Sequence, residues 1–138
     1  MSEDRIAALA AQMAAHGTAR DAPVRAIMAL LGDRWTTLIL LVLATGTWRH
    51  AELKRVLARL SEEKAISQRV LTLKLRALER DGLVARSVSA DVPPRVSYRL
   101  TALGEGLVGE AQRLIAWIEA RTVQIHAARA VFDAQGEE

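Results

Sequence analysis

Hydrophobic residues recur at helical spacing over most of the chain, and this pattern divides it into segments. In residues 4–15, apolar side chains stand at positions i, i+3, i+4 and i+7, which is the spacing of one helix face. A short helix is expected from Pro23 to Gly32, because proline suits a first helical turn and glycine a helix end. The next segment, 34–44, is apolar on nearly all sides and follows Asp33, a suitable N-cap, so we expect a buried central helix there. The apolar residues on the helix face within residues 4–15 are Ile6, Leu9, Ala10 and Met13.

Two amphipathic helices are predicted in the middle of the chain. The segment 49–60 places its apolar residues on one face and its basic residues elsewhere. The segment 67–80 begins at Ser67, a suitable N-cap, and ends before Gly82, which suits the left-handed position that follows a helix. A polar connector, residues 61–65, separates the two helices.

The helix 67–80 has two faces of different character. At about 100° per residue, three leucines share one side. They are Leu71, Leu75 and Leu78. The opposite side carries Arg69, Leu73, Arg76 and Arg80, with Gln68 and Thr72 at its flank. We therefore expect the leucine side to pack on a core and the arginine side to face outward.

Two short segments with period-two alternation follow, "LVARSVS" at 83–89 and "RVSYRL" at 95–100. The sequence between them, "ADVPP", cannot extend a ladder because proline has no N–H to donate, so we expect a β-hairpin with a stiff tip. Thr101 then suits the N-cap of a final helix over residues 101–130, which is longer than the mean helix of ~11–12 residues. Residues 131–138 are expected to form a tail.

This order of elements predicts one domain, residues 1–138, that is mainly α with a small β-hairpin wing. A buried helix, an amphipathic helix, a connector, a helix with an arginine face, a hairpin and another helix follow one another as in a winged helix-turn-helix. We assign that unit to residues 22–100, preceded by an N-terminal amphipathic helix within 1–21. This helix and the helix 101–130 are predicted to form a homodimer by burying apolar surface that a winged helix cannot cover. Packing of both helices on their own core is the alternative.

Composition and charge narrow the function. The chain has 138 residues, of which 51% are hydrophobic and 25% charged, and it has no cysteine, which excludes disulfides, thiolate metal sites and cysteine nucleophiles. Its net charge is +3, but residues 49–99 carry 12 Lys or Arg against 6 Asp or Glu. Positive charge concentrated in this way is typical of a surface that binds a polyanion, with a merely solvated basic surface as the alternative.

In a winged helix-turn-helix, the second helix of the motif lies in the major groove and the hairpin reaches the flanking backbone or the minor groove. The hypothesis is therefore sequence-specific binding of double-stranded DNA. The candidate contacts in the recognition helix are Ser67, Gln68, Arg69, Thr72, Leu73 and Arg76, and those in the wing are Pro94 and Arg95. The candidate phosphate contacts, with plain solvated charge as the alternative, are Lys54, Arg55 and Lys74.

Other chemistry is either weakly indicated or excluded. The candidates for an effector pocket between the winged helix and the terminal helices are Trp35, Trp48 and Trp117, which are otherwise ordinary core residues. The histidines, His16, His50 and His126, lack the spacing of a metal site. Since no acidic residue pairs with a nucleophile or base, we expect no enzyme activity, no metal and no cofactor.

The apolar runs are short. The longest, 38–44, is far below the ~20 residues of a membrane-spanning helix, and the first residues lack the positive start of a secretory signal. We expect a cytoplasmic protein without membrane contact.

Three motifs also resemble a known family. "LLGDRWTTLIL", "ISQRVLTLKLRALERDGLVAR" and "VPPRVSYRLTALGEGL" look like the HxlR-type winged-helix transcriptional regulators, relatives of the MarR group, over about residues 22–120. The resemblance implies a dimeric DNA-binding regulator with the fold argued above. By motif position it implies base or phosphate contacts from Gln68, Arg69, Thr72, Leu73 and Arg76, and from Arg95 in the wing.

The sequence departs from this family in three places. Several members sense oxidants with a cysteine just ahead of a Pro-Val pair, but Ala22 stands there, so thiol sensing is not carried over. The connector 61–65 is several residues longer than usual, which predicts a looser helix-turn-helix. Leu73 stands where a polar residue is common, and it would contact a thymine methyl group or have no role.

The leading hypothesis is a homodimeric regulator that binds a pseudo-palindromic operator and represses transcription by covering the promoter. The first alternative is a winged-helix interaction module whose arginine face binds an acidic protein. The second alternative is a protein whose main task is to bind a small molecule.

Overall fold

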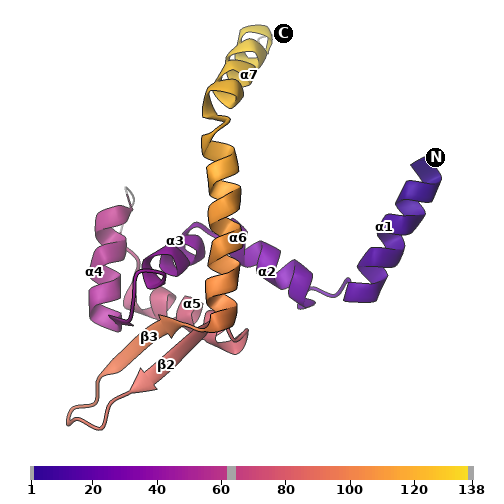
Figure 1. The fold of residues 1–138 in the computed structure, drawn as a ribbon. Coiled ribbons are helices and arrows are strands. Elements are labelled where there is room, and N and C mark those ends of the chain that lie inside the picture. Colours follow the sequence, from indigo (N-terminus) through magenta and orange to yellow (C-terminus); the bar gives the residue numbers. More distant parts are fainter. Residues whose placement is uncertain (1, 62–64, 137–138) are drawn as a thin grey trace.

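The computed structural model describes residues 2–61 and 65–136 and is mainly helical with one small antiparallel sheet (Figure 1). Its elements are α1 (Ser2–His16), α2 (Pro23–Gly32), α3 (Arg34–Leu43), β1 (Trp48–Arg49), α4 (His50–Leu60), α5 (Gln68–Arg80), β2 (Val84–Val88), β3 (Val96–Leu100), α6 (Ala102–Glu119) and α7 (Thr122–Gln135). This order confirms the predicted winged helix-turn-helix, in which α4 and α5 form the motif and β2 and β3 the wing. Most of the connector predicted at 61–65 lies outside the described residues.

The predicted helix starts are confirmed. Asp33, Ser67 and Thr101 each accept a hydrogen bond from the backbone N–H three residues further along, at 2.9, 3.1 and 3.1 Å. These side chains satisfy N–H groups that have no partner within the helix, which stabilises each start by about 1 kcal/mol. Local sequence therefore fixes where α3, α5 and α6 begin.

Side chains from α2 to α6 and from the sheet form one hydrophobic core. The leucine face of α5 is completely buried in it, as predicted, since Leu71, Leu75 and Leu78 have no exposed surface. Burying a leucine stabilises the fold by about 1.5–3 kcal/mol. The other fully buried side chains are Ile39, Leu40, Leu53, Leu57, Val84 and Thr36. With one side of α5 fixed in the core, its opposite side must face outward.

The turn after α5 brings the start of α6 very close to the sheet. Gly82 adopts φ 75°, and the Leu83 N–H donates to the Leu78 carbonyl oxygen at 3.0 Å, so the helix ends as predicted. The Leu83 carbonyl oxygen in turn accepts the Thr101 N–H at 3.0 Å. A Cβ atom added to the buried Gly104 would lie only 2.0 Å from that oxygen. Glycine at position 104 is thus required for α6 to lie against the turn.

The wing has one strand more than the sequence predicts. The strand order is β1-β3-β2, all antiparallel, and Trp48 in β1 is paired with Tyr98 in β3. The prediction of a two-stranded hairpin was incomplete because two residues cannot display a period-two pattern. This extra strand joins the sheet directly to the N-terminus of α4.

The prediction of one continuous helix over 101–130 was wrong. The chain turns at Ala120–Arg121, between α6 and α7, and α7 continues to Gln135 through residues expected to be tail. At this turn the Arg121 side chain replaces its own backbone: its Nη1 donates to the Trp117 carbonyl oxygen at 3.0 Å, while the Arg121 backbone N–H donates to the Ile118 carbonyl oxygen at 2.9 Å. The guanidinium also stacks 4.2 Å from the centroid of the Trp117 ring system. It thus takes the carbonyl that a continuous helix would need at this point.

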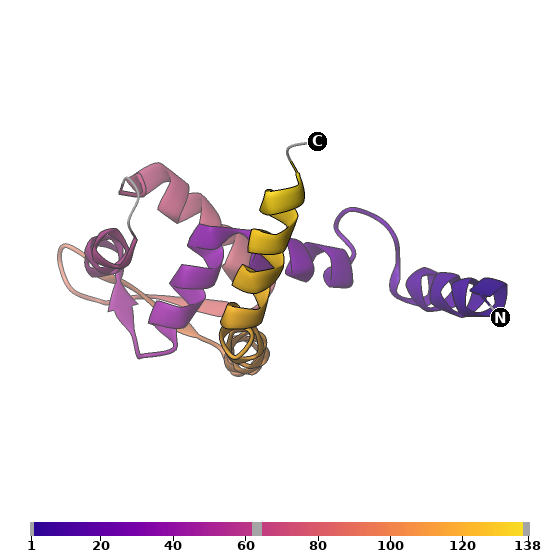
Figure 2. The same cartoon turned by 90° about the horizontal axis from the view of Figure 1, so that it is seen from above.

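The helices at the two ends of the chain lie away from the core (Figures 1 and 2). Every residue of α1 is exposed, and α7 is exposed throughout except for the half-buried Ile125. Their exposed apolar residues include Ile6, Leu9, Met13, Val123, Val131 and Phe132. α1 and α7 therefore carry apolar surface that the described part of the chain leaves uncovered.

Candidate nucleic-acid interface

The outward side of α5 presents most of the predicted recognition residues. The exposed ones are Ser67, Gln68, Arg69, Leu73 and Arg76. Leu73 is 56% exposed, so an apolar side chain stands between polar ones on an open helix face. The Ser67 hydroxyl already caps the helix by accepting the Val70 N–H. Ser67 can therefore offer DNA its hydroxyl hydrogen while its oxygen remains bonded to the helix.

Thr72 differs from these residues because its hydroxyl is held by another element. Its Oγ1 lies 3.0 Å from Nε2 of His50, the first residue of α4. The His50 ring is tilted against that of Tyr98 in β3, with centroids 6.3 Å apart. Burial, together with the positive charge of Lys54, lowers the pKa of His50 below its ordinary value. The sequence gives no sign of this contact, since 22 positions separate the two residues.

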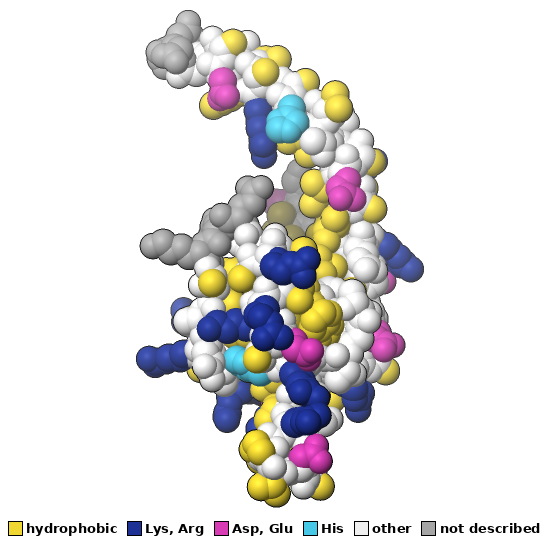
Figure 3. All heavy atoms as spheres, turned by 90° about the vertical axis from the view of Figure 1, so that its left-hand side faces the viewer, with side chains coloured by type: hydrophobic (Ala, Val, Ile, Leu, Met, Phe, Trp, Pro, Cys, Tyr) yellow, Lys and Arg dark blue, Asp and Glu magenta, His cyan; other side chains and the backbone are white. Residues whose placement is uncertain are grey.

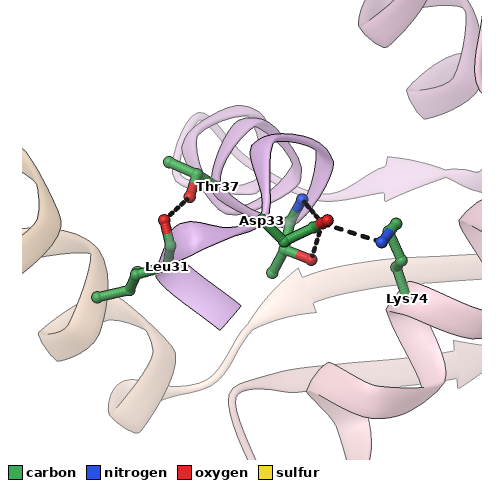
Figure 4. A network of polar contacts seen from close by, with 5 residues as sticks. Leu31, Asp33, Thr37 and Lys74 are labelled. Atoms are coloured by element: carbon green, nitrogen blue, oxygen red, sulfur yellow. Dashed lines mark hydrogen bonds and ion pairs between the residues drawn. The ribbon is translucent and has the colours of Figure 1, made fainter. Parts of the chain in front are cut away.

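Lys74, predicted as a phosphate contact, is held within the protein (Figure 4). Its Nζ lies 2.9 Å from Oδ2 of Asp33, and both side chains are partly exposed. The same carboxylate accepts from the backbone N–H and the hydroxyl of Thr36, at 2.9 and 2.7 Å. Burial raises the pKa of Asp33, but these hydrogen bonds and Lys74 outweigh it and hold the pKa below its ordinary value. Lys74 thus joins α5 to the first turn of α3.

Lys54 and Arg55 lie side by side in sequence on α4 but differ in exposure. Arg55 is exposed, whereas Lys54 is half-buried near His50. Cations on the helix that precedes the recognition helix are suited to phosphate contacts. Their role as phosphate contacts stays a prediction.

The wing holds the backbone of Arg95 and leaves its side chain exposed. Ser89 donates its N–H to the Arg95 carbonyl oxygen and accepts the Arg95 N–H on its hydroxyl, both at 2.9 Å. The Arg95 guanidinium lies 3.8 Å from the Asp91 carboxylate, and both side chains are more than half exposed. Such exposed pairs contribute only about 0–1 kcal/mol, so Arg95 can exchange Asp91 for a phosphate. Pro94 beside it is also exposed.

Positive charge gathers on the surface formed by α4, α5 and the sheet, which we call the basic surface. Its exposed members are Arg49, Arg55, Arg59, Arg69, Arg76, Arg80, Arg86, Arg95 and Arg99. Figure 3 shows Lys and Arg side chains crowded on one side of this region, above the protruding wing, with few acidic side chains among them. This distribution matches the excess of basic residues between 49 and 99.

The three tryptophans predicted for an effector pocket lie on three separate elements. Trp35 in α3 lines a hollow of about 460 Å³ together with Leu38, Leu41 and other residues of α3 and the end of α4. Trp48 in β1 packs on the core, and Trp117 in α6 is 54% exposed beneath Arg121. The structure therefore does not bring these three side chains into one pocket.

A larger hollow, of about 540 Å³, lies where α2, the turn after α5 and α6 meet. Ile27, Leu83 and Leu107 supply apolar walls, and Asp21 and Asp81 add carboxylates. Asp81 is also the C-cap of α5. The hollow thus touches the end of the recognition helix. Hydrophobic periodicity gives no sign of it, because its walls come from separate elements.

The chain matches a known protein family over most of its length. Residues 30–126 match the family described as HxlR-like helix-turn-helix. The chain belongs to the HxlR family. This confirms the family suggested by the sequence motifs.

Individual relatives of this HxlR-family chain agree with the assignment. The HTH-type transcriptional regulator YtfH of Escherichia coli K12 is 35% identical over 111 residues, which cover 80% of this chain and 83% of the relative. The solved structure of the transcriptional regulator ytfH from Salmonella typhimurium superposes with a TM-score of 0.64 at 36% identity, covering 81% of this chain and 95% of that one. A MarR-family regulator from Enterococcus faecalis V583 gives a TM-score of 0.62 at 33% identity, covering 81% and 94%.

The HxlR-family chain is thus a transcriptional regulator of the helix-turn-helix type, a class of DNA-binding proteins. Among the residues the structure describes, no single helix has the length and hydropathy to cross a membrane. Only α2 and α3 taken together meet that test, and they are bent by 90° from one another.

Proposed function

We propose that the protein is a homodimeric regulator that binds a pseudo-palindromic operator and represses transcription by covering a promoter. The observation that carries the proposal is the face of α5 opposite its buried leucines, where Gln68, Arg69, Leu73 and Arg76 stand exposed beside one another. A helix anchored on one side and polar on the other fits the major groove of DNA. Because regulation requires access to chromosomal DNA, the proposal includes a cytoplasmic location.

Each side chain of the interface has a proposed role. Arg69 and Arg76 bind guanine or phosphate, and Gln68 binds an adenine edge. Thr72 contacts a base edge, and Leu73 contacts a thymine methyl group. Arg95 in the wing binds a phosphate or enters the minor groove, with Pro94 stiffening the backbone beside it. Phosphate contacts from Ser67, Lys54 and Arg55 complete the surface. Lys74 is assigned instead to its ion pair with Asp33.

The proposed dimer buries the apolar surface of α1, α6 and α7. Besides the exposed residues of α1 and α7, α6 carries Leu114, Trp117 and Ile118, each at least 45% exposed. Apolar patches of this extent on a small protein typically mark an interface. A two-fold axis through these helices would place two recognition helices about one DNA turn, ~34 Å, apart, which requires an inverted repeat in the operator.

A small-molecule effector is also part of the proposal, and its place is the hollow between α2 and α6. Its volume of about 540 Å³ falls within the range of ligand sites, and its apolar walls with Asp21 and Asp81 favour an apolar molecule that carries a positive charge. A thermal shift with tetraphenylphosphonium that is absent with tetraphenylborate, and reduced in Asp81→Asn, would support this site. Equal shifts with both ions would refute it.

The function is tested by selecting duplexes from a random library and measuring their affinity by fluorescence anisotropy at several salt concentrations. We expect one inverted-repeat sequence, a preference of about 10³-fold or more over scrambled DNA, and a steep salt dependence. Arg76→Ala should weaken binding by about 1–3 kcal/mol, whereas Arg113→Ala on α6, whose side chain is 81% exposed, should leave it unchanged. Equal, weak binding to all duplexes would contradict the proposal and favour an acidic protein partner.

A further inference from the structure

His50 stands where α4, α5 and the sheet meet. Its Nε2 lies 3.0 Å from the Thr72 hydroxyl in α5, and its ring faces Tyr98 in β3. Burial and the nearby Lys54 lower the pKa of His50, so the ring is neutral at physiological pH. A neutral imidazole has one nitrogen that donates a hydrogen bond and one that accepts.

Thr72 lies half-buried at the flank of the outward face of α5, one helical turn from both Gln68 and Arg76. A threonine hydroxyl has one hydrogen to donate and two lone pairs that accept. In many helices the hydrogen goes to the carbonyl one turn earlier. Within the described residues, the hydrogen-bonding partner of the Thr72 hydroxyl is His50 alone.

We propose that His50 is a positioning residue for DNA sequence recognition, which holds the Thr72 hydroxyl in one direction and thereby determines which base group Thr72 contacts. The inference rests on the proposed function. In the tautomer whose Nε2 carries no hydrogen, Thr72 donates to that nitrogen. The lone pairs of the hydroxyl then remain to accept from the amino groups of adenine or cytosine. Without that nitrogen the hydroxyl rotates and also donates to guanine N7 or O6 and to thymine O4, so the preference at that base pair becomes weaker.

The contact is well placed for such a role because the histidine is fixed from outside the recognition helix. β1 joins the sheet directly to α4, with Trp48 paired to Tyr98, and the backbone N–H of Arg49 donates to the Glu52 carboxylate at 3.3 Å. His50 follows directly, so its backbone is set by both the sheet and the start of α4. A hydroxyl bonded to this fixed ring loses little further freedom on binding DNA.

The test is a selection from operator duplexes randomised one position at a time, with the full-length protein and three variants. Thr72→Val identifies the base pair that Thr72 faces. We expect His50→Phe, which keeps the ring but removes both nitrogens, to weaken the preference at that same base pair about three- to tenfold, the range for one hydrogen bond, and at no other position. His50→Gln should restore it, because the amide oxygen accepts as the ring nitrogen does. The double variant Thr72→Val with His50→Phe should show the same preference at that base pair as Thr72→Val alone.

The control is Thr47→Val, which removes an exposed hydroxyl outside the recognition helix and the terminal helices and should leave every position unchanged. The inference is overturned if His50→Phe keeps the wild-type preference at the Thr72 base pair, or lowers preference equally at all positions, or behaves like His50→Gln. A thermal melt verifies folding, and His50→Leu provides the same test if the phenylalanine variant does not fold. A wild-type protein without any sequence preference would instead refute the proposed function, so the two failures are distinguishable.

Discussion

Gly104 lies where the first turn of α6 meets the turn after α5, and Gly104→Ala should destabilise the protein although alanine favours helices. The added Cβ atom would lie 2.0 Å from the Leu83 carbonyl oxygen, while real Cβ contacts are essentially never shorter than 3.0 Å. That oxygen accepts the Thr101 N–H, and the Leu83 N–H donates to Leu78, so the backbone is held on both sides. Either α6 or the turn at Leu83 must therefore shift, so that the two atoms lie about 1 Å further apart.

The size of the effect follows from two opposing contributions. Forcing an additional atom into a packed site usually costs about 1–3 kcal/mol. The upper value applies here, because the atom in the way is a backbone carbonyl oxygen, that of Leu83. Replacing a helical glycine by alanine contributes about 1 kcal/mol in the opposite direction. The net loss in the free energy of unfolding should be about 2 kcal/mol, or a fall in Tm of about 5–10 °C.

Gly106, two residues further along α6, provides the matched control. A Cβ atom there meets nothing within 4 Å, so Gly106→Ala should raise the free energy of unfolding by about 0.5–1 kcal/mol. The assay is thermal unfolding followed by circular dichroism at one fixed protein concentration, because association makes Tm depend on concentration. The same sign for both substitutions, or a Gly104→Ala protein as stable as the wild type, would refute the argument from close packing.

Two further predictions concern charged groups. Because the pKa of Asp33 is lower in the folded chain, its contribution to stability is present above about pH 4 and disappears as the pH falls through the folded pKa. The Asp33→Asn protein should lack this component of acid unfolding. Equal acid-unfolding profiles for the variant and the wild type would contradict the prediction. Because the pKa of His50 is also lower in the folded chain, the unfolded chain takes up the proton first, so stability should decrease as the pH falls below about 6.5. Urea unfolding at several pH values should show a smaller decrease in the free energy of unfolding for His50→Gln than for the wild type. An NMR titration that gives the His50 ring its ordinary pKa or a higher one would exclude the effect.

Local sequence was sufficient for most of the secondary structure. Helix starts at Asp33, Ser67 and Thr101 and the helix end at Gly82 depend on hydrogen bonds or backbone angles within a few residues, so residue type alone indicates them. The burial of the leucine side of α5 follows from helical periodicity, which also fixes the exposed side that carries Arg69 and Arg76. The sequence therefore determined the fold class and the outward face of α5.

Contacts between residues far apart in the chain were decided by the tertiary structure. Lys74 looked like a free cation in sequence, but packing of α5 on α3 places it against Asp33. Packing of α4 on α5 in the same way gives Thr72 a histidine partner. No periodic pattern specifies such pairs, because they depend on how separate elements are positioned relative to each other.

The C-terminal helices were predicted only in part. Apolar spacing correctly indicated a helix beyond Thr101, but it continues through residues 120–121 and therefore gave no sign of the turn between α6 and α7. Sequence alone determined that this protein has a helix-turn-helix packed on a hydrophobic core, a wing and terminal helices with apolar residues, since these follow from periodicity and capping. Only the tertiary structure decided which polar side chains stay available for DNA, because availability depends on the partners that folding brings within hydrogen-bonding distance.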